Sequence, residues 1–99
     1  MFYTYILYSQ STNSFYKGHT NDITARLSRH NGKREKYTSK GCPWILVWFA
    51  EKGSKSEAYQ FEMKLKNLSR DRLIKLMLKF EENIGGPDEL FLIKQLSGR

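Results

Sequence analysis

Arg26 and His30 have the types and the spacing that chemistry on a phosphate requires. They are four residues apart, so a helix through them places both on one face. An arginine in this position can hold a phosphate with two hydrogen bonds, and a histidine can move a proton near neutral pH. A solvated basic helix also explains the pair, and for the pair alone we favour that simpler interpretation.

Tyr5 and Tyr16 precede this pair, in two segments whose composition predicts paired strands. Most tyrosines in strands are packing residues. A phenol with a pKa of about 10 is a poor base at neutral pH unless neighbouring cations lower that value. Lys17, Arg26 and a bound metal would be such cations. The two phenols are therefore either packing residues or, beside these cations, proton-transfer groups.

Glu62 is the third candidate because helical spacing places it on the same side as Ala58, Phe61 and Leu65. A carboxylate on an apolar side loses hydration unless another group pairs with it. From the residues alone we expect a salt bridge to Arg26. The functional alternative is a divalent cation, since Mg²⁺ often binds one or two carboxylates together with phosphate oxygens and water.

A hairpin and a short helix are the elements that would position these groups. Residues 2–8 are aromatic and β-branched, which predicts a strand, and residues 10–14 are turn-forming. A second strand begins at residues 15–16, and we expect Gly18 to end it. Asn21 or Asp22 can then cap a helix that runs to residue 31.

Residues 32–43 contain four basic residues and show neither helical nor strand periodicity, so we expect a loop. This segment is a candidate contact for a phosphate backbone, although a solvated loop explains it nearly as well. The basic and polar side chains that we expect to contact nucleic acid are Lys17, His19, Arg29, Lys33, Arg34, Lys36 and Lys40.

The second half of the chain predicts one strand and two helices. Residues 44–50 are apolar on both faces, which indicates a central strand covered on both sides. The spacing of Ser54 and Glu57 matches a capping box and predicts a helix to residue 66 or 67. Ser69 can cap a third helix, which the glycines at 85–86 end. Its expected apolar face consists of Leu73, Leu76, Met77 and Phe80.

These elements predict a small α+β fold, in which helices flank a three-stranded sheet of antiparallel type, in the order β-β-α-β-α-α followed by a tail. We expect the domain to span residues 1–84 and the tail residues 85–99. The apolar residues between 90 and 96 indicate either a short helix that packs back or a segment that binds a protein partner.

Composition limits the functional classes. The chain has 99 residues, enough for one domain, and its 39% hydrophobic content argues against disorder. The run at 44–50 is far shorter than the roughly 20 residues that span a bilayer, so we expect no membrane partner. We see no secretory signal, and the single Cys42 excludes an internal disulfide, so we expect a reducing, cytoplasmic location. The 17 basic against 10 acidic residues favour a polyanionic partner and salt-sensitive binding.

The order of these features resembles the GIY-YIG nuclease family. The first tripeptide of that family falls on residues 4–6 and the second on residues 16–18, with Thr4 and Lys17 as departures. The family's arginine helix matches residues 26–30, and its glutamate helix matches residues 56–62. The resemblance covers roughly residues 2–80 in register. Within the family, the chain is most similar to small stand-alone bacterial proteins related to the nuclease domain of the excision-repair incision subunit.

The resemblance implies a metal-dependent endonuclease that hydrolyses phosphodiester bonds in DNA, with a connection to DNA repair. Glu62 would hold one Mg²⁺ or Mn²⁺, and Tyr5 or Tyr16 would help to deprotonate the attacking water while the other positions it. Arg26 would neutralise charge on the phosphoryl oxygens, and His30 would assist proton movement or bind phosphate.

Two other functions remain open from the sequence. A non-catalytic nucleic-acid-binding module on the same fold would keep the basic residues and need no metal. The late asparagine found in some family members has no clear counterpart here, which favours that alternative. A protein-interaction module acting through the tail is the third possibility. No recognition module accompanies the core, so we expect little base specificity.

Overall fold

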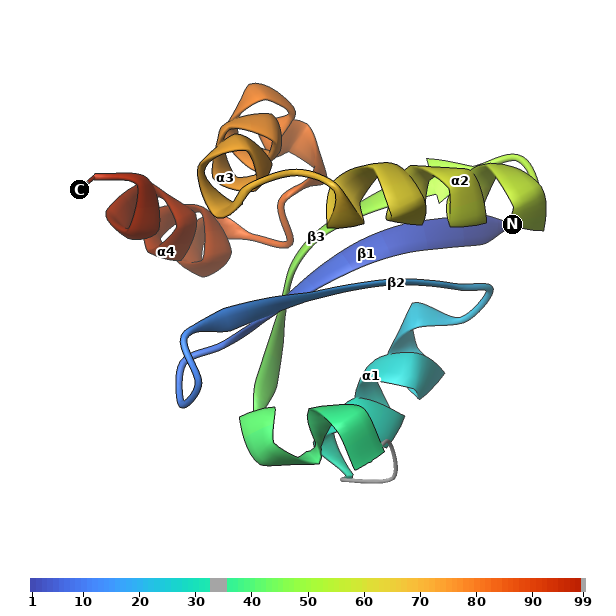
Figure 1. Cartoon of the computed structure of the whole chain (residues 1–99), viewed down its shortest axis with the longest axis horizontal. Coiled ribbons are helices and arrows are strands. Elements are labelled where there is room, and N and C mark those ends of the chain that lie inside the picture. Colours follow the sequence, from blue (N-terminus) through green and yellow to red (C-terminus); the bar gives the residue numbers. More distant parts are fainter. Residues whose placement is uncertain (33–35, 99) are drawn as a thin grey trace.

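The computed structural model describes residues 1–32 and 36–98, and it contains one antiparallel sheet of three strands (Figure 1). The strands are β1 (Phe2–Ser9), β2 (Ser14–Thr20) and β3 (Trp44–Lys52), in the spatial order β2-β1-β3. The hairpin predicted at the start of the chain is present, and β1 is the central strand.

Helices cover both faces of this sheet (Figure 1). On one face lie α1 (Ile23–Asn31) and the short 3₁₀ helix η1 (Lys36–Gly41). On the other face lie α2 (Lys55–Lys66), α3 (Arg70–Lys79) and α4 (Pro87–Ser97), with the 3₁₀ helix η2 (Glu81–Asn83) between the last two. The predicted α+β class is confirmed, with the tail adding a fourth α-helix. Among the described residues, none of the helices is long and apolar enough to cross a membrane.

The predicted helix caps are present. Asp22 accepts a hydrogen bond from a backbone N–H of the first turn of α1, and Ser54 and Ser69 do the same for α2 and α3. The carboxylate of Glu57 accepts from the backbone N–H of Gly53 at 3.1 Å, one residue before the position that a capping box uses. These contacts satisfy donors that a helix start leaves without partners.

Three sequence predictions about the strands and the loop are wrong, for physical reasons. Strand β3 is an edge strand, not the central strand that its sequence predicts. The prediction is wrong because the apolar residues on both faces of β3 pack beneath helices on both sides of the sheet, and this does not require a neighbouring strand on each side. Strand β2 continues past Gly18 to Thr20, since Gly18 pairs with Tyr5 in the ladder. The segment expected to be a loop contains η1, which is too short to produce a periodic pattern.

The larger part of the core lies between the sheet and helices α2, α3 and α4. In α3 the buried residues include Ile74 beside Leu73 and Met77, whereas Phe80, expected on the buried face, is 41% exposed. Ile93 of α4 is fully buried in this core, so the tail packs back as a helix. The division into a domain over residues 1–84 and a tail over residues 85–99 stays a prediction.

Candidate active site

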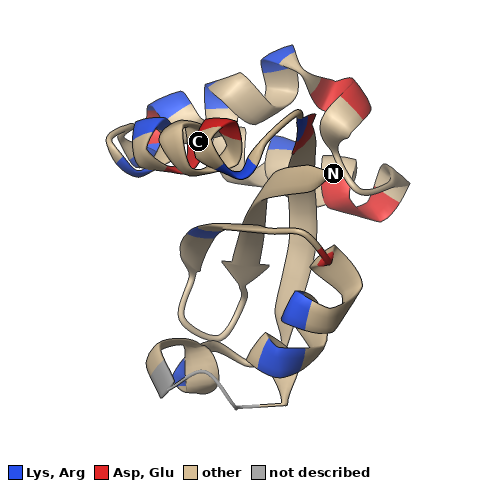
Figure 2. Ribbon diagram, turned by 90° about the vertical axis from the view of Figure 1, so that its right-hand side faces the viewer, with Lys and Arg blue, Asp and Glu red and all other residues tan. Residues whose placement is uncertain are grey.

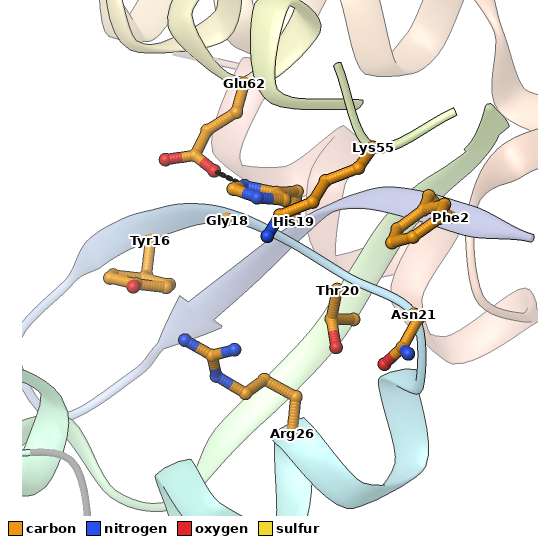
Figure 3. A pocket seen from close by; sticks show the side chains of 9 residues that line it. All are labelled: Phe2, Tyr16, Gly18, His19, Thr20, Asn21, Arg26, Lys55 and Glu62. Atoms are coloured by element: carbon orange, nitrogen blue, oxygen red, sulfur yellow. Dashed lines mark hydrogen bonds and ion pairs between the residues drawn. The ribbon is translucent and has the colours of Figure 1, made fainter. Parts of the chain in front are cut away.

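An open pocket of about 390 Å³ lies along the outer edge of β2, between α2 on one side and α1 on the other (Figure 3). Three of the five residues predicted to be catalytic line it, namely Tyr16, Arg26 and Glu62. Gly18 and His19 of β2 also line the pocket. The fold therefore brings together side chains that are up to 46 residues apart in the sequence, counting from Tyr16 to Glu62.

The other predicted phenol, Tyr5, lies directly beneath Gly18 and is only 2% exposed. A Cβ atom on Gly18 would lie 2.6 Å from the hydroxyl oxygen of Tyr5 and 3.2 Å from Cε2 of Tyr16. The two phenol rings are 6.3 Å apart between centroids. Glycine at this position is thus what lets the backbone of β2 rest on both tyrosines.

His30 is fully buried and lies behind the tyrosines rather than in the pocket. Its Nε2 atom is 3.1 Å from the hydroxyl of Tyr5, and its Nδ1 atom is 2.8 Å from the hydroxyl of Thr38. Its ring also meets the ring of Tyr16 edge-on, at 4.9 Å between centroids. The expectation that His30 binds phosphate does not fit this burial, and its geometry instead suits holding Tyr5 in place.

Glu62 is 7% exposed, and each of its carboxylate oxygens has a partner. Oε1 accepts a hydrogen bond from Nδ1 of His19 at 2.6 Å, and Oε2 is 2.6 Å from Nζ of Lys66. The expected salt bridge to Arg26 is replaced by these two contacts. The reason is the sheet itself, because β2 runs between Glu62 on the α2 side and Arg26 on the α1 side (Figure 3).

The lysines around Glu62 influence one another. The pKa of Lys66 is raised above 10.5, chiefly because Lys66 donates a hydrogen bond to Glu62, and the charges of Glu62 and the nearby tyrosines add to the effect. The pKa of Lys17 is lowered below 10.5, first by burial and then by repulsion from Lys66. Lys66 is therefore favoured in its charged form beside the carboxylate.

The carboxylate of Glu62 suits a cation that takes few protein ligands. Among residues 1–32 and 36–98, no group of three or more His, Cys, Asp or Glu side chains lies close enough to hold a metal. Each carboxylate oxygen can accept more than the one contact it makes here, and Glu62 lines an open pocket. These features fit Mg²⁺ or Mn²⁺ completed by phosphate oxygens and water, and they do not fit an all-protein cage.

The residues expected to contact nucleic acid fall in several places. Lys17 and His19 are on β2 beside α2, while Arg29 and Lys40 are exposed on α1 and η1. Lys33 and Arg34 lie outside the described residues, as does the side chain of Lys36. The first 50 residues contain seven basic and two acidic side chains, and Figure 2 shows most acidic positions on the side of α2, α3 and α4.

Sequence reasoning missed three residues that complete the site. Lys66 was detectable, because it lies four residues after Glu62 on one helix, the spacing of an ion pair. Lys55 lines the pocket from the start of α2, and nothing in its sequence context indicates this. Thr38 lies in the segment interpreted as a loop, and only the folded structure brings it to His30.

Comparisons with known proteins give a consistent set of relatives. A family model described as the GIY-YIG catalytic domain matches residues 1–75. UPF0213 protein SH2523 of Staphylococcus haemolyticus is 40% identical over 76 residues, which is 76% of this chain and 92% of the relative. UPF0213 protein OB0043 of Oceanobacillus iheyensis is 38% identical over 81% of this chain and 92% of its own. The solution NMR structure of UPF0213 protein BH0048 from Bacillus halodurans has 37% identity and a TM-score of 0.55, covering 90% of this chain and 92% of that one.

Proposed function

Since the chain belongs to the GIY-YIG family, we propose that it is a metal-dependent endonuclease that hydrolyses phosphodiester bonds in DNA. The observation that carries this proposal is the meeting of Tyr16, Arg26 and Glu62 in one pocket, above the buried Tyr5. The finer likeness to the nuclease domain of the excision-repair incision subunit, and with it a role in DNA repair, stays a prediction because the relatives found are small UPF0213 proteins.

Arg26 supplies the phosphate-binding side of the pocket. Its guanidinium group points from α1 toward the space beside Tyr16 (Figure 3). Such a group can donate two hydrogen bonds to non-bridging phosphoryl oxygens and stabilise the charge that grows on them in the transition state. Lys55 adds a second positive charge from the α2 side of the same pocket.

Tyr16 is the phenol that faces the pocket, so we assign it the contact with the attacking water. The buried Tyr5 is then a positioning residue, because its hydroxyl is tied to His30 and its ring packs beside that of Tyr16. Arg26 lines the same pocket as Tyr16, and the charge of Lys66 interacts with that of Tyr16. His30 supports this arrangement from behind, anchored in turn by Thr38.

Glu62 is the residue that would hold the divalent ion, which when bound supplies charge neutralisation and makes a water molecule more acidic. His19 keeps one oxygen of Glu62 directed toward the pocket, and Lys66 holds the other. The two contacts fix the carboxylate in one orientation before any ligand arrives, which lowers the reorganisation needed for catalysis.

DNA is the proposed polymer because the net charge of +7 favours polyanions and the pocket is open at the edge of the sheet. One observation also favours the non-catalytic binding module. Both oxygens of Glu62 already have partners, so a protein that bound DNA without metal would leave this arrangement intact. Cleavage measurements separate the two functions.

The test is cleavage of labelled single-stranded, nicked, branched and duplex DNA with Mg²⁺, Mn²⁺ or EDTA, comparing wild type with Arg26→Ala. We expect cleavage only with a metal, and a loss of about 100-fold or more in the variant. Arg72→Ala is the matched control, since Arg72 is exposed on α3 outside the pocket. Binding without cleavage under every condition would identify the non-catalytic module instead.

A further inference from the structure

Two exposed tyrosines, Tyr37 and Tyr59, stand on opposite sides of the pocket. We propose that they stack on unpaired bases on either side of the bound phosphate, so that the preferred ligand is single-stranded DNA. This inference rests on the proposed function for the identity of the pocket as the phosphate site. It adds the substrate class, which neither the family nor the relatives assign to this chain.

Tyr37 lies on η1 and is 89% exposed, more than any of the other large hydrophobic side chains that the structure describes. Its ring centroid is 6.2 Å from that of Tyr16, the phenol that lines the pocket. The next residue, Thr38, is buried and bonded through its hydroxyl to His30 and through its carbonyl to the indole N–H of Trp44. The residue that follows Tyr37 is therefore anchored, while the ring of Tyr37 stays exposed beside that of Tyr16.

Tyr59 occupies the corresponding position on the other side. It lies on α2, is 50% exposed, and meets the ring of His19 edge-on at 5.7 Å between centroids. The preceding residue, Ala58, is fully buried, and its carbonyl accepts a hydrogen bond from the hydroxyl of Thr4 at 2.9 Å. Each tyrosine is thus one ring contact from the pocket and is attached to an anchored backbone.

Tyr37 and Tyr59 lie on opposite sides of the sheet, because η1 and α2 cover opposite faces of it in Figure 1. A strand whose phosphate enters the pocket at the edge of β2 therefore has one exposed phenol beside each neighbouring nucleotide. Base-on-aromatic stacking is a sequence-tolerant contact, and nearby lysines track the backbone. Lys40 is exposed on η1 near Tyr37, and Lys55 lies on α2 near Tyr59.

The same geometry disfavours continuous duplex. In a duplex both faces of each base are covered by neighbouring base pairs, so a tyrosine can stack only after a base has been unstacked and unpaired. Unpaired bases already expose their faces, so no free energy of unstacking or unpairing is needed. Tyr37 and Tyr59 each lie next to an anchored residue, so they lose little conformational freedom on binding. This favours a ligand whose bases are already unpaired.

The experiment measures dissociation constants in EDTA for a labelled 20-nucleotide single strand and for its duplex, at one salt concentration. We expect tighter binding of the single strand by wild type. Tyr37→Ala and Tyr59→Ala should each weaken single-strand binding by about five- to tenfold, the low end for base stacking, and change duplex binding less than about twofold. Tyr37→Phe should bind like wild type, because it keeps the ring.

Phe91→Ala is the matched control, since Phe91 is 64% exposed on α4 and does not line the pocket. It should leave both dissociation constants unchanged. All three tyrosine variants alter exposed side chains, and unchanged thermal unfolding will show that they fold. Equal losses for single strand and duplex, or no loss for either tyrosine, would overturn the proposal.

Photo-crosslinking with 5-iodouracil gives an independent readout of stacking. Crosslinks from a single strand should map to the peptides that contain Tyr37 and Tyr59, and crosslinks confined to other peptides would contradict the proposal. Because EDTA prevents metal-dependent cleavage, these results do not depend on activity. A preference for single strands without cleavage when metal is added would refute the endonuclease and support the stacking sites. Cleavage without a preference for single strands would support the endonuclease and refute the stacking sites.

Discussion

Gly18→Ala tests the contact between β2 and the two tyrosines. The added Cβ would lie 2.6 Å from the hydroxyl oxygen of Tyr5 and 2.7 Å from its Cζ atom, whereas ordinary contacts begin near 3.4 Å. The phenol has little room to move, since it is 2% exposed and held at 3.1 Å by His30. Overpacking of this kind costs about 1–3 kcal/mol in the free energy of unfolding.

That cost lowers the midpoint of thermal unfolding by about 5–20 °C for a domain of this size. Circular dichroism on heating measures it directly. Gly53→Ala is the matched control, because its Cβ would meet only the far end of the exposed Glu57 side chain, at 3.0 Å, and that end can shift. The control should change the free energy of unfolding by no more than about 0.5 kcal/mol. Equal midpoints for the two variants would refute the close packing of Gly18 on Tyr5.

Three further predictions concern the same site. Tyr5→Phe removes the hydroxyl that hydrogen-bonds Nε2 of the buried His30 and should lower the free energy of unfolding by about 1–3 kcal/mol, measured by urea titration. Lys66→Met releases one oxygen of Glu62 from an ion pair, so Mn²⁺ should bind several-fold more tightly in calorimetry; unchanged affinity would contradict this. The pKa of Lys17 is lowered in the folded protein, so its charged form is disfavoured there. Its contribution to the free energy of unfolding should therefore rise as the pH rises from the lowered pKa to 10.5. The difference in the free energy of unfolding between wild type and Lys17→Met, measured by urea titration, should therefore shift in favour of wild type as the pH rises through that range.

The hairpin, the helix caps and the order of elements could be predicted because local signals specify them. Asp22, Ser54 and Ser69 cap the helices that their positions predict, since a cap depends on residues within one turn. The edge position of β3 was not predictable in this way. The apolar residues on its two faces indicate that helices cover the sheet, but they do not indicate the order of the strands. Strand order depends on contacts between residues that are distant in the sequence.

The candidate site was predictable in residue identity and less so in geometry. The family resemblance predicts Tyr16, Arg26 and Glu62 as site residues, and all three line one pocket, while their roles stay predictions. It could not show that the sheet separates Glu62 from Arg26, because that depends on which face each helix covers. The burial of His30 was equally hidden, since a helical histidine in sequence carries no sign of the threonine that meets it.

Exposed aromatic residues are the feature that sequence reasoning recovers least. Tyr37 and Tyr5 are the same residue type, yet one is 89% exposed and the other is 2% exposed. Tyr5 lies in an apolar strand, which predicts burial. Tyr37 lies in a basic segment without periodicity, where composition fixes neither the backbone nor the direction of the side chain. Only the anchoring of the neighbouring Thr38 shows that Tyr37 is held beside the pocket.

The most direct test of the proposed activity compares Glu62→Ala with wild type in a DNA cleavage assay with Mg²⁺, Mn²⁺ or EDTA. Glu82→Ala is the control, since Glu82 is an exposed carboxylate outside the pocket. We predict metal-dependent cleavage by wild type and Glu82→Ala, a loss of about 100-fold or more in Glu62→Ala, and similar DNA binding in EDTA by all three. Cleavage by Glu62→Ala at the wild-type rate would contradict the assignment of Glu62 as the metal-holding residue.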